Sequence, residues 1–253
     1  MRIAINCRSF LRKQYTGIGR YAYHLVKSLG EIDPRNQYEL YVRKGVFSFN
    51  KKIPRFPSKN FISRVDWFGR GPEKILKNID VFHIPSPGPM QVPGGAKAVV
   101  TVHDIIFKAF PESHTPETIE AGEREFDEIR KKADKIICCS VNTANDLKKY
   151  FQVPDRRIAV IYQGVDQSDF RPLNSDEKVL AGKELVRRGI EGPFILSVGT
   201  IEPRKNLVNS IKAFGILRAQ KKFSGDLVVI GRKGWMREDV SALIEKLGLK
   251  RNI

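Results

Sequence analysis

Long apolar runs and paired cysteines are missing from this sequence, and acidic residues are far fewer than basic ones. No stretch approaches the roughly 18 consecutive apolar residues that a membrane-spanning helix needs. The first residues, 1–7, lack the charged, apolar and small-residue segments of a secretory signal peptide. Three cysteines, two of them adjacent, fit neither a disulfide framework nor a zinc site. We therefore expect a cytoplasmic protein in which Cys7, Cys138 and Cys139 are buried thiols.

Basic residues dominate the charge of the chain. Its 253 residues include 45 Lys and Arg but only 28 Asp and Glu, so the formal net charge is +17. A chain with this charge favours polyanionic partners, whether nucleic acid, an anionic membrane surface or phosphorylated small molecules. The 41% apolar content is enough for the cores of one large or two modest domains.

The positive charge is concentrated in the segment 43–77. Ten Lys and Arg residues lie there against only Asp66 and Glu73. Six aromatic residues are interleaved with them: Phe47, Phe49, Phe56, Phe61, Trp67 and Phe68. This pattern is typical of segments whose rings enter a lipid interface while their cations contact anionic headgroups. We therefore predict peripheral binding at the inner face of the plasma membrane. The alternatives are stacking on single-stranded nucleic acid and a solvated loop whose rings anchor it to the core.

Short apolar strands alternate with longer helical stretches, which predicts an α/β fold with parallel sheets. The expected strands are 3–7, 38–42, 81–84, 98–102, 135–140 and 158–162, and the expected helices are 19–29, 115–133 and 143–151. The rhythm changes around 164–172, and a polar stretch follows at 174–188. We place a domain boundary there, so that residues 1–172 form a first domain and residues 173–253 belong to a second.

The second domain contains few elements. The expected ones are strand 194–198, helix 207–221, strand 226–230 and helix 238–247. Two parallel strands and two helices are too little for an independent core, because both faces of such a sheet need cover. We expect this domain to be incomplete.

The apolar strand 194–198, which we expect to be buried, runs into a helix start through Gly199, Arg204, Lys205 and Asn206. Gly199 allows close approach of the backbone, and Asn206 is expected to cap the helix. Unpaired N–H groups and the partial positive charge of a helix start favour an anion, and two full charges lie at the same place. The junction predicts a diphosphate site. The alternative is a pair of solvated loop cations.

Gly17 and Gly19 belong to a G-x-G-x-x-A pattern that ends at Ala22, as in dinucleotide-binding dehydrogenases. The spacing argues against that class, because nine residues separate Cys7 from Gly17 and a basic pair follows the second strand. The two glycines still permit an unusual backbone path at a helix start. The alternative is a plain tight turn.

His103 and Asp104 follow the strand 98–102, at the end where open parallel sheets carry functional groups. His103 is a candidate hydrogen-bond donor or general base, and Asp104 is a candidate to orient it. A structural role is the alternative. The other histidines, His24, His83 and His114, show no ligand spacing, so we predict no metal site.

Five motifs occur in a defined order, at 16–21, 102–104, 161–166, 198–207 and 230–235. Their order and spacing resemble glycosyltransferase family 4, the retaining nucleotide-sugar transferases of the GT-B fold, over the whole chain. The resemblance implies an α/β fold of the GT-B type. A Rossmann-like, acceptor-side domain would lie at 1–172, and the first part of a Rossmann-like, nucleotide-sugar-binding domain would lie at 173–253.

The family resemblance also implies roles for single residues. Gly17 and Gly19 would approach the phosphate and sugar of the donor, and His103 would lie near the transferred sugar. Arg204 and Lys205 would hold the donor diphosphate. No cofactor and no metal is implied, because two cations and a helix start can stabilise the departing diphosphate.

The resemblance further implies transfer of a hexose, of the mannose or glucose class, from a GDP- or UDP-sugar to a glycan or lipid-linked acceptor in cell-surface polysaccharide synthesis. Two departures from the family pattern stand out. The chain ends before a Glu-x7-Glu motif that holds the donor, and Gln163 stands where Asn is common. We therefore expect residues 1–253 alone to show no measurable transfer. An inactive fragment of such an enzyme and a basic nucleic-acid-binding module are the alternative hypotheses.

Overall fold

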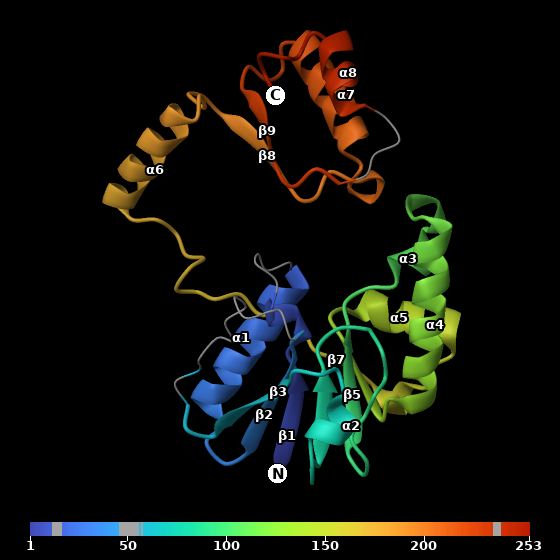
Figure 1. Ribbon diagram of the computed structural model, residues 1–253. Helices are drawn as coiled ribbons and strands as arrows, with labels where there is room; N and C mark the ends of the chain where they lie inside the picture. Colours follow the sequence, from blue (N-terminus) through green and yellow to red (C-terminus); the bar gives the residue numbers. More distant parts are fainter. Residues whose placement is uncertain (12–16, 46–55, 57, 235–238) are drawn as a thin grey trace. The chain divides into compact units, whose positions relative to one another are not determined.

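The computed structural model describes residues 1–11, 17–45, 56, 58–234 and 239–253. They form two compact units, Met1–Asp166 and Gln167–Ile253 (Figure 1). The boundary expected after residue 172 lies a few residues further along the chain. Several residues of the segments 16–21, 43–77 and 230–235 lie outside the described ones: Thr16, Phe47, Phe49, Lys51, Lys52, Arg55 and Trp235.

The described residues of the first unit form a seven-stranded parallel sheet with the order β3-β2-β1-β4-β5-β6-β7. The strands are β1 (Arg2–Asn6), β2 (Gln37–Arg43), β3 (Phe61–Asp66), β4 (Val81–Ile84), β5 (Lys97–Val102), β6 (Lys135–Cys138) and β7 (Ile158–Val160). The chain adds strands on one side of β1, then crosses to β4 and adds strands on the other side. The direction of strand addition therefore reverses between β1 and β4.

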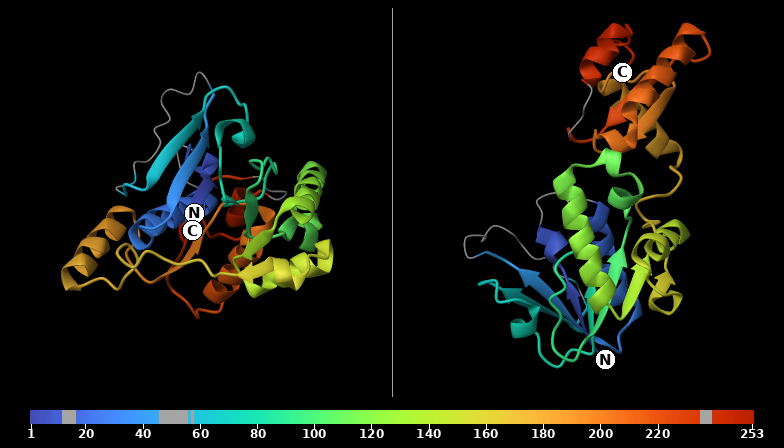
Figure 2. Two further views of the ribbon diagram at one scale, coloured as in Figure 1. Left: turned by 90° about the horizontal axis from the view of Figure 1, so that it is seen from below. Right: turned by 90° about the vertical axis from the view of Figure 1, so that its right-hand side faces the viewer.

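Helices cover both faces of this sheet (Figures 1 and 2). The helices of the unit are α1 (Gly17–Ile32), the short α2 (Pro72–Ile75) and α3 (Ile106–Ala109), α4 (Pro116–Lys132) and α5 (Val141–Phe151). Ile5 of β1 belongs to the same apolar cluster as Val26 of α1. The adjacent Ala4 belongs to the cluster of Ile129 and Leu147, on α4 and α5. Because successive strand residues point to opposite faces, β1 is buried between the two helical layers.

Strand β3 and helix α2 lie inside the cationic segment 43–77, where the charge pattern did not reveal them. β3 tolerates a charged residue because its Arg64 donates from Nε to Glu39 on neighbouring β2, at 2.8 Å. Arg2 of β1 donates to the same carboxylate at 2.6 Å. Ion pairing across three neighbouring strands thus replaces the apolar alternation that marks most strands.

The aromatic residues of this segment divide into two groups. Phe56 and Phe61 pack against the core, and Phe61 stacks on Tyr38 with ring centroids 4.7 Å apart. These two rings therefore agree with the alternative interpretation, in which aromatic residues anchor the segment to the core. Trp67 and Phe68 are instead exposed, at 38% and 72%.

The second unit contains the parallel strands β8 (Phe194–Val198) and β9 (Asp226–Ile230) and the helices α6 (Ser175–Arg187), α7 (Leu207–Ala219) and α8 (Val240–Lys246). Its apolar cluster gathers Ile211 and Phe214 of α7 with Leu227 of β9. The expectation of a buried β8 is wrong: Leu196 is 51% exposed and Val198 is 68% exposed. Both strands are edges of a two-stranded sheet among the described residues, so the apolar side chains of β8 have few neighbours.

Helix α6 occupies the polar stretch 174–188, for which no element was expected. Asn174 accepts a hydrogen bond from the backbone N of Glu177 at 2.9 Å, and the Glu177 carboxylate accepts from the backbone N of Asn174 at 2.9 Å. This capping box was the sequence signal for the helix. Among the described helices of both units, none has the length and apolar content needed to cross a membrane.

Candidate functional site

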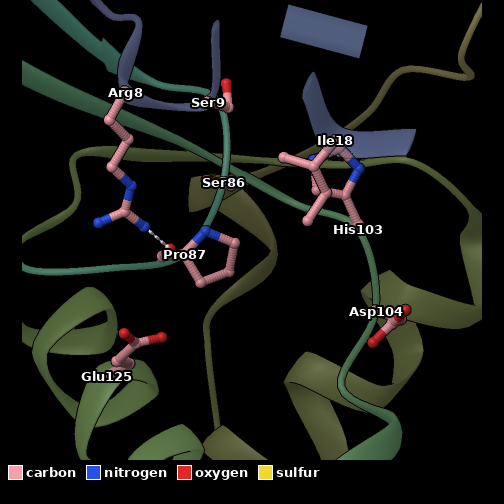
Figure 3. Close-up of a pocket in the computed structure, with 8 residues that line it drawn as sticks. All are labelled: Arg8, Ser9, Ile18, Ser86, Pro87, His103, Asp104 and Glu125. Atoms are coloured by element: carbon pink, nitrogen blue, oxygen red, sulfur yellow. Dashed lines mark hydrogen bonds between the residues drawn. The ribbon is translucent and has the colours of Figure 1, made fainter. Parts of the chain in front are cut away.

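A cavity of about 610 Å³ opens at the carboxyl ends of the strands in the first unit (Figure 3). It is bounded by the connections after β1, β4 and β5, by the start of α1 and by α4. The residues that line it are Arg8, Ser9, Ile18, Ser86, Pro87, His103, Asp104 and Glu125. Strand addition reverses between β1 and β4, so the connections that follow these two strands diverge. They leave the crevice in which open α/β sheets bind ligands. The sheet order therefore explains why the cavity forms at this point.

His103 is half-buried in the wall of the cavity. Its Nε2 donates to the carbonyl of Pro85 at 2.9 Å, and its Nδ1 accepts from the side-chain amide of Gln163 at 2.8 Å. The Sγ of Cys139 lies 3.5 Å from the same Nδ1. The ring of Tyr21 packs edge-on against the imidazole, with centroids 5.0 Å apart. The ring is therefore held in one orientation from several sides.

Asp104 is exposed at the same cavity, but its carboxylate turns to its own loop. Oδ1 of Asp104 accepts from the backbone N of Ile106 at 3.4 Å. The orienting role expected of Asp104 is thus taken by the groups that contact the His103 ring. Asp104 and Glu125 also line a second hollow of about 450 Å³ beside α3 and α4. The two carboxylates therefore stand where both hollows meet.

Arg8 and Glu125 are cavity residues that the sequence pattern did not reveal. Arg8 follows β1, and its guanidinium donates to the carbonyl of Pro87 after β4, as the dashed line in Figure 3 shows. Glu125 comes from α4, far from the other lining residues in sequence. Only the position of Arg8 directly after the first strand was a usable signal.

Gly17 and Gly19 are the first and third residues of α1, and neither has a positive φ. The unusual backbone path that these glycines permit is therefore not taken. A Cβ at Gly17 would meet no heavy atom within 4 Å. Ile18, between them, lines the cavity. The start of α1 thus lies at the same cavity as His103.

In the second unit, Gly199 directly follows β8 and has a φ of 152°, a conformation that favours glycine. The aliphatic chain of Lys205 lies over it, since a Cβ at Gly199 would be 3.6 Å from Lys205 Cε. Arg204 pairs from Nε with Oε1 of Glu202 at 2.5 Å. The structure therefore brings Gly199 and Lys205 together, and gives Arg204 a carboxylate partner that an anion would have to displace or share.

Asn206 does not cap α7 with its side chain, so that expectation is wrong. Its backbone has a φ of 55°, and its side chain makes no cap hydrogen bond. The left-handed residue turns the chain out of the 3₁₀ helix Pro203–Lys205 and into α7. Asparagine tolerates this conformation better than most residues do. The left-handed backbone conformation, and not a hydrogen bond of the side-chain amide, therefore explains the asparagine at position 206.

The loop after β9 runs beside Gly199. A Cβ at Gly231 would lie 1.7 Å from the carbonyl O of Gly199, so only glycine fits there. Ile201 bridges to Lys233 and donates to the carbonyl of Arg232 at 2.9 Å. Parallel pairing thus adds two basic residues, which were not among the predicted site residues, to the sheet edge that carries Arg204 and Lys205.

The three cysteines are free, and their environments differ. Cys7 and Cys138 are buried as expected, and burial raises the pKa of Cys138 to about 11. Cys139 is only half-buried, which contradicts the expectation. Burial raises the pKa of its thiol, although a hydrogen bond from Gln163 opposes the shift. Cys139 is therefore a neutral thiol beside His103.

Comparison with known proteins identifies the class to which this fold and site belong. Residues 15–169 match the model of the family described as Glycosyltransferase Family 4, and residues 186–253 match the model described as Glycosyl transferases group 1. The solved structure of WaaG, a glycosyltransferase involved in lipopolysaccharide biosynthesis, matches 99% of this chain and 68% of its own, with a TM-score of 0.59 at 17% identity. That likeness concerns the fold alone. The chain belongs to glycosyltransferase family 4, and the predicted α/β fold of the GT-B type is confirmed.

Two curated relatives are similar in sequence. The chain is 28% identical over 254 residues to the O-antigen chain mannosyltransferase B of Escherichia coli. This alignment covers 91% of this chain and 64% of that protein. It is 30% identical over 165 residues to the serotype-specific mannosyltransferase WbdA of Escherichia coli. This second alignment covers 60% of this chain and 19% of that protein. The chain therefore spans less than two thirds of the length of either relative.

Proposed function

We propose that the protein transfers a hexose from a nucleotide diphosphate sugar to a glycan or lipid-linked acceptor in the synthesis of a cell-surface polysaccharide. The observation that carries the proposal is that His103, in a chain of family 4, lines a cavity where strand addition reverses. GDP-mannose is the first candidate donor, because the two relatives described above are named mannosyltransferases. UDP-glucose is the second.

The donor diphosphate is assigned to the end of β8. Arg204 and Lys205 supply two cations there, and backbone N–H groups at the start of α7 supply a partial positive charge. As the bond to the sugar breaks, negative charge grows on the diphosphate, and fixed cations lower the barrier without a metal. Retention of configuration at the sugar is part of the proposal and follows from the family resemblance.

The acceptor is assigned to the cavity of the first unit. Asp104 and Glu125 are hydrogen-bond acceptors for sugar hydroxyls, and Arg8, which lines the same cavity, supplies donors (Figure 3). The second hollow continues from the two carboxylates along α3 and α4. Two adjoining hollows with polar groups at their junction suit an elongated ligand such as an oligosaccharide.

An anionic membrane surface is the proposed partner of the loop after β3. Asp66 is buried and accepts from the hydroxyl of Tyr41 at 2.8 Å and from the backbone N atoms of Arg70 and Gly71 at 3.0 and 2.9 Å. Burial works to raise the pKa of Asp66, but these hydrogen bonds outweigh it and hold the pKa below its usual value. The buried carboxylate therefore organises a tight turn around itself.

That turn directs two aromatic rings outward. Trp67 and Phe68 are exposed, with Lys44 Nζ 5.2 Å from the Trp67 ring centroid and Arg70 Cζ 5.4 Å from that of Phe68. Exposed rings flanked by cations suit the interface of a bilayer with anionic lipids. We assign this contact to the inner face of the plasma membrane, where lipid-linked acceptors would be available.

The transfer reaction is tested with the full polypeptide that carries this sequence. Nucleotide release is followed with GDP-mannose, UDP-glucose and related donors, with and without lipid-linked oligosaccharide acceptors. We expect acceptor-dependent release of GDP from GDP-mannose. Binding of random RNA at near-physiological salt, with no release from any nucleotide sugar, would instead support the nucleic-acid-binding alternative.

A further inference from the structure

Four neighbouring strands contribute to the surroundings of the His103 ring. Pro85 follows β4, His103 follows β5, Cys139 follows β6 and Gln163 lies just beyond β7. These strands are adjacent in the sheet, so their carboxyl ends meet at one edge. The ring is the point at which the four connections come into contact.

The hydrogen bonds at His103 specify where its proton lies. The carbonyl of Pro85 can only accept, so Nε2, at 2.9 Å, must carry the hydrogen. In a neutral ring Nδ1 is then an acceptor, and its partner at 2.8 Å must be a donor. The amide N of Gln163 is that donor. Both ring nitrogens are therefore satisfied when His103 is neutral with its proton on Nε2.

The position of Gln163 is fixed on both sides along the chain. Before it, Ile161 donates from its backbone N to the carbonyl of Cys138 at 3.0 Å, which extends the pairing of β6 and β7. After it, the Asp166 carboxylate accepts from Nζ of Lys27 on α1 at 3.1 Å. The segment between these two attachments is short. The backbone on either side therefore directs the side chain of Gln163 toward the His103 ring.

We propose that Gln163 is a positioning residue for His103, which it fixes in the Nε2–H tautomer and in one ring orientation. In this state neither ring nitrogen is free to remove a proton, so His103 acts on the sugar through contact and not as a general base. Cys139 supports the arrangement, because Gln163 Nε2 also lies 3.0 Å from its Sγ. The statement about the tautomer is independent of the reaction, whereas the positioning role rests on the proposed function.

Substitutions at Gln163 separate this inference from a general effect on folding. Gln163→Glu keeps the size of the side chain but offers only acceptors, and therefore favours a proton on Nδ1. Gln163→Met keeps the length and removes the donor. Gln163→Asn keeps the amide on a shorter side chain. Gln167→Glu introduces the same charge as the first variant four residues away, and serves as the control.

The tautomer is measured in the ¹⁵N-labelled 253-residue chain from the side-chain ¹⁵N shifts of its four histidines, with His103→Gln assigning the signal of His103. We expect an unprotonated Nδ1 and a protonated Nε2 in the wild type and in Gln167→Glu. In Gln163→Glu, Nδ1 should become protonated. In Gln163→Met only the Pro85 carbonyl still fixes the proton, so the Nδ1–H tautomer should become populated beside a predominant Nε2–H form. A wild-type spectrum with a proton on Nδ1, or one that Gln163→Glu leaves unchanged, would overturn the proposal.

The positioning role is measured by nucleotide release in the full polypeptide. We expect Gln163→Met to lower kcat by about tenfold, because the His103 ring loses its fixed orientation, with little change in donor KM. Gln163→Asn should recover part of the loss. Wild-type kcat in Gln163→Met, together with an altered tautomer, would remove the positioning role. If no form transfers sugar, the proposed function fails while the spectra still decide the tautomer.

Discussion

His83 of β4 and Thr101 of β5 face each other inside the first unit, with Nε2 of His83 2.8 Å from Oγ1 of Thr101. His83 is 8% exposed, and burial lowers its pKa to about 4. In the unfolded chain the pKa returns to its usual value of about 6.5. Between these two values the unfolded state binds a proton that the folded state does not, so stability is lost as the pH falls through this range.

We predict that burial of His83 removes about 3 kcal/mol from the unfolding free energy of the first unit between pH 6.5 and pH 4, at about 1.4 kcal/mol per pH unit. The measurement is urea denaturation at several pH values, followed by Trp67 fluorescence in a Trp235→Phe background. His83→Asn should flatten the pH dependence. The same slope in wild type and His83→Asn would refute the assignment.

A second prediction concerns the turn after β3. We expect the chain to sediment with vesicles of phosphatidylglycerol and phosphatidylcholine, and less as salt rises. Arg70→Ala should weaken binding by about fivefold, since one well-placed cation is worth about 1 kcal/mol. Trp67→Ala combined with Phe68→Ala should weaken it further, because two rings leave the interface.

The control for this experiment is Phe110→Ala, which removes an exposed ring from a connection elsewhere in the same unit. It should bind vesicles as the wild type does. Equal binding to pure phosphatidylcholine and to anionic vesicles would exclude the electrostatic mechanism.

A third prediction concerns the junction after β8. We expect Arg204→Ala and Lys205→Ala each to weaken donor binding by about ten- to hundredfold, because a charge-assisted hydrogen bond to phosphate is worth about 1.5–3 kcal/mol. Titration calorimetry of the full polypeptide with GDP-mannose and UDP-glucose measures the loss. Lys212→Ala removes the same charge from the middle of α7 and should bind normally. Unchanged affinity in both junction variants would show that the diphosphate binds elsewhere.

A fourth prediction concerns the cavity of the first unit. We expect His103→Ala to lower kcat more than it weakens donor binding, because the residue is assigned to the sugar undergoing transfer. Asp104→Asn should instead raise the KM of the acceptor, since its carboxylate lies at the wall assigned to sugar hydroxyls. Steady-state kinetics with the donor and the acceptor varied separately distinguishes the two effects. Normal kinetics in both variants would return the pair to a purely structural role.

A fifth prediction follows from the exposure of β8. Backbone amides in β8 and β9 should exchange hydrogen for deuterium faster than those in β1, β4 and β5, because fewer buried contacts oppose local opening. Exchange of the 253-residue chain, read by mass spectrometry of peptides, makes the comparison directly. Equal protection in the two units would contradict the expectation of a looser second unit.

Most elements of the fold could be predicted from the sequence because their side chains follow a local period. The expected strands 194–198 and 226–230 agree with β8 and β9, and helix 115–133 agrees with α4 to within a residue at each end. Strand β3 could not be predicted in this way. In the sequence its Arg64 has the character of a surface residue. Its partner, Glu39, lies on a strand that is distant in sequence. Local patterns carry no information about such a pairing.

The sequence alone determined the α/β class, the family and the chemistry available at the strand ends, since these depend on residue type, order and spacing. Only the tertiary structure decided how those groups combine. It placed Arg8 and Glu125 in the cavity of His103 and made Gln163, not Asp104, the partner of the imidazole. The physical reason is that side chains meet at a sheet edge according to strand order in space, and the order β1-β4-β5-β6-β7 cannot be deduced from the spacing of the strands along the chain.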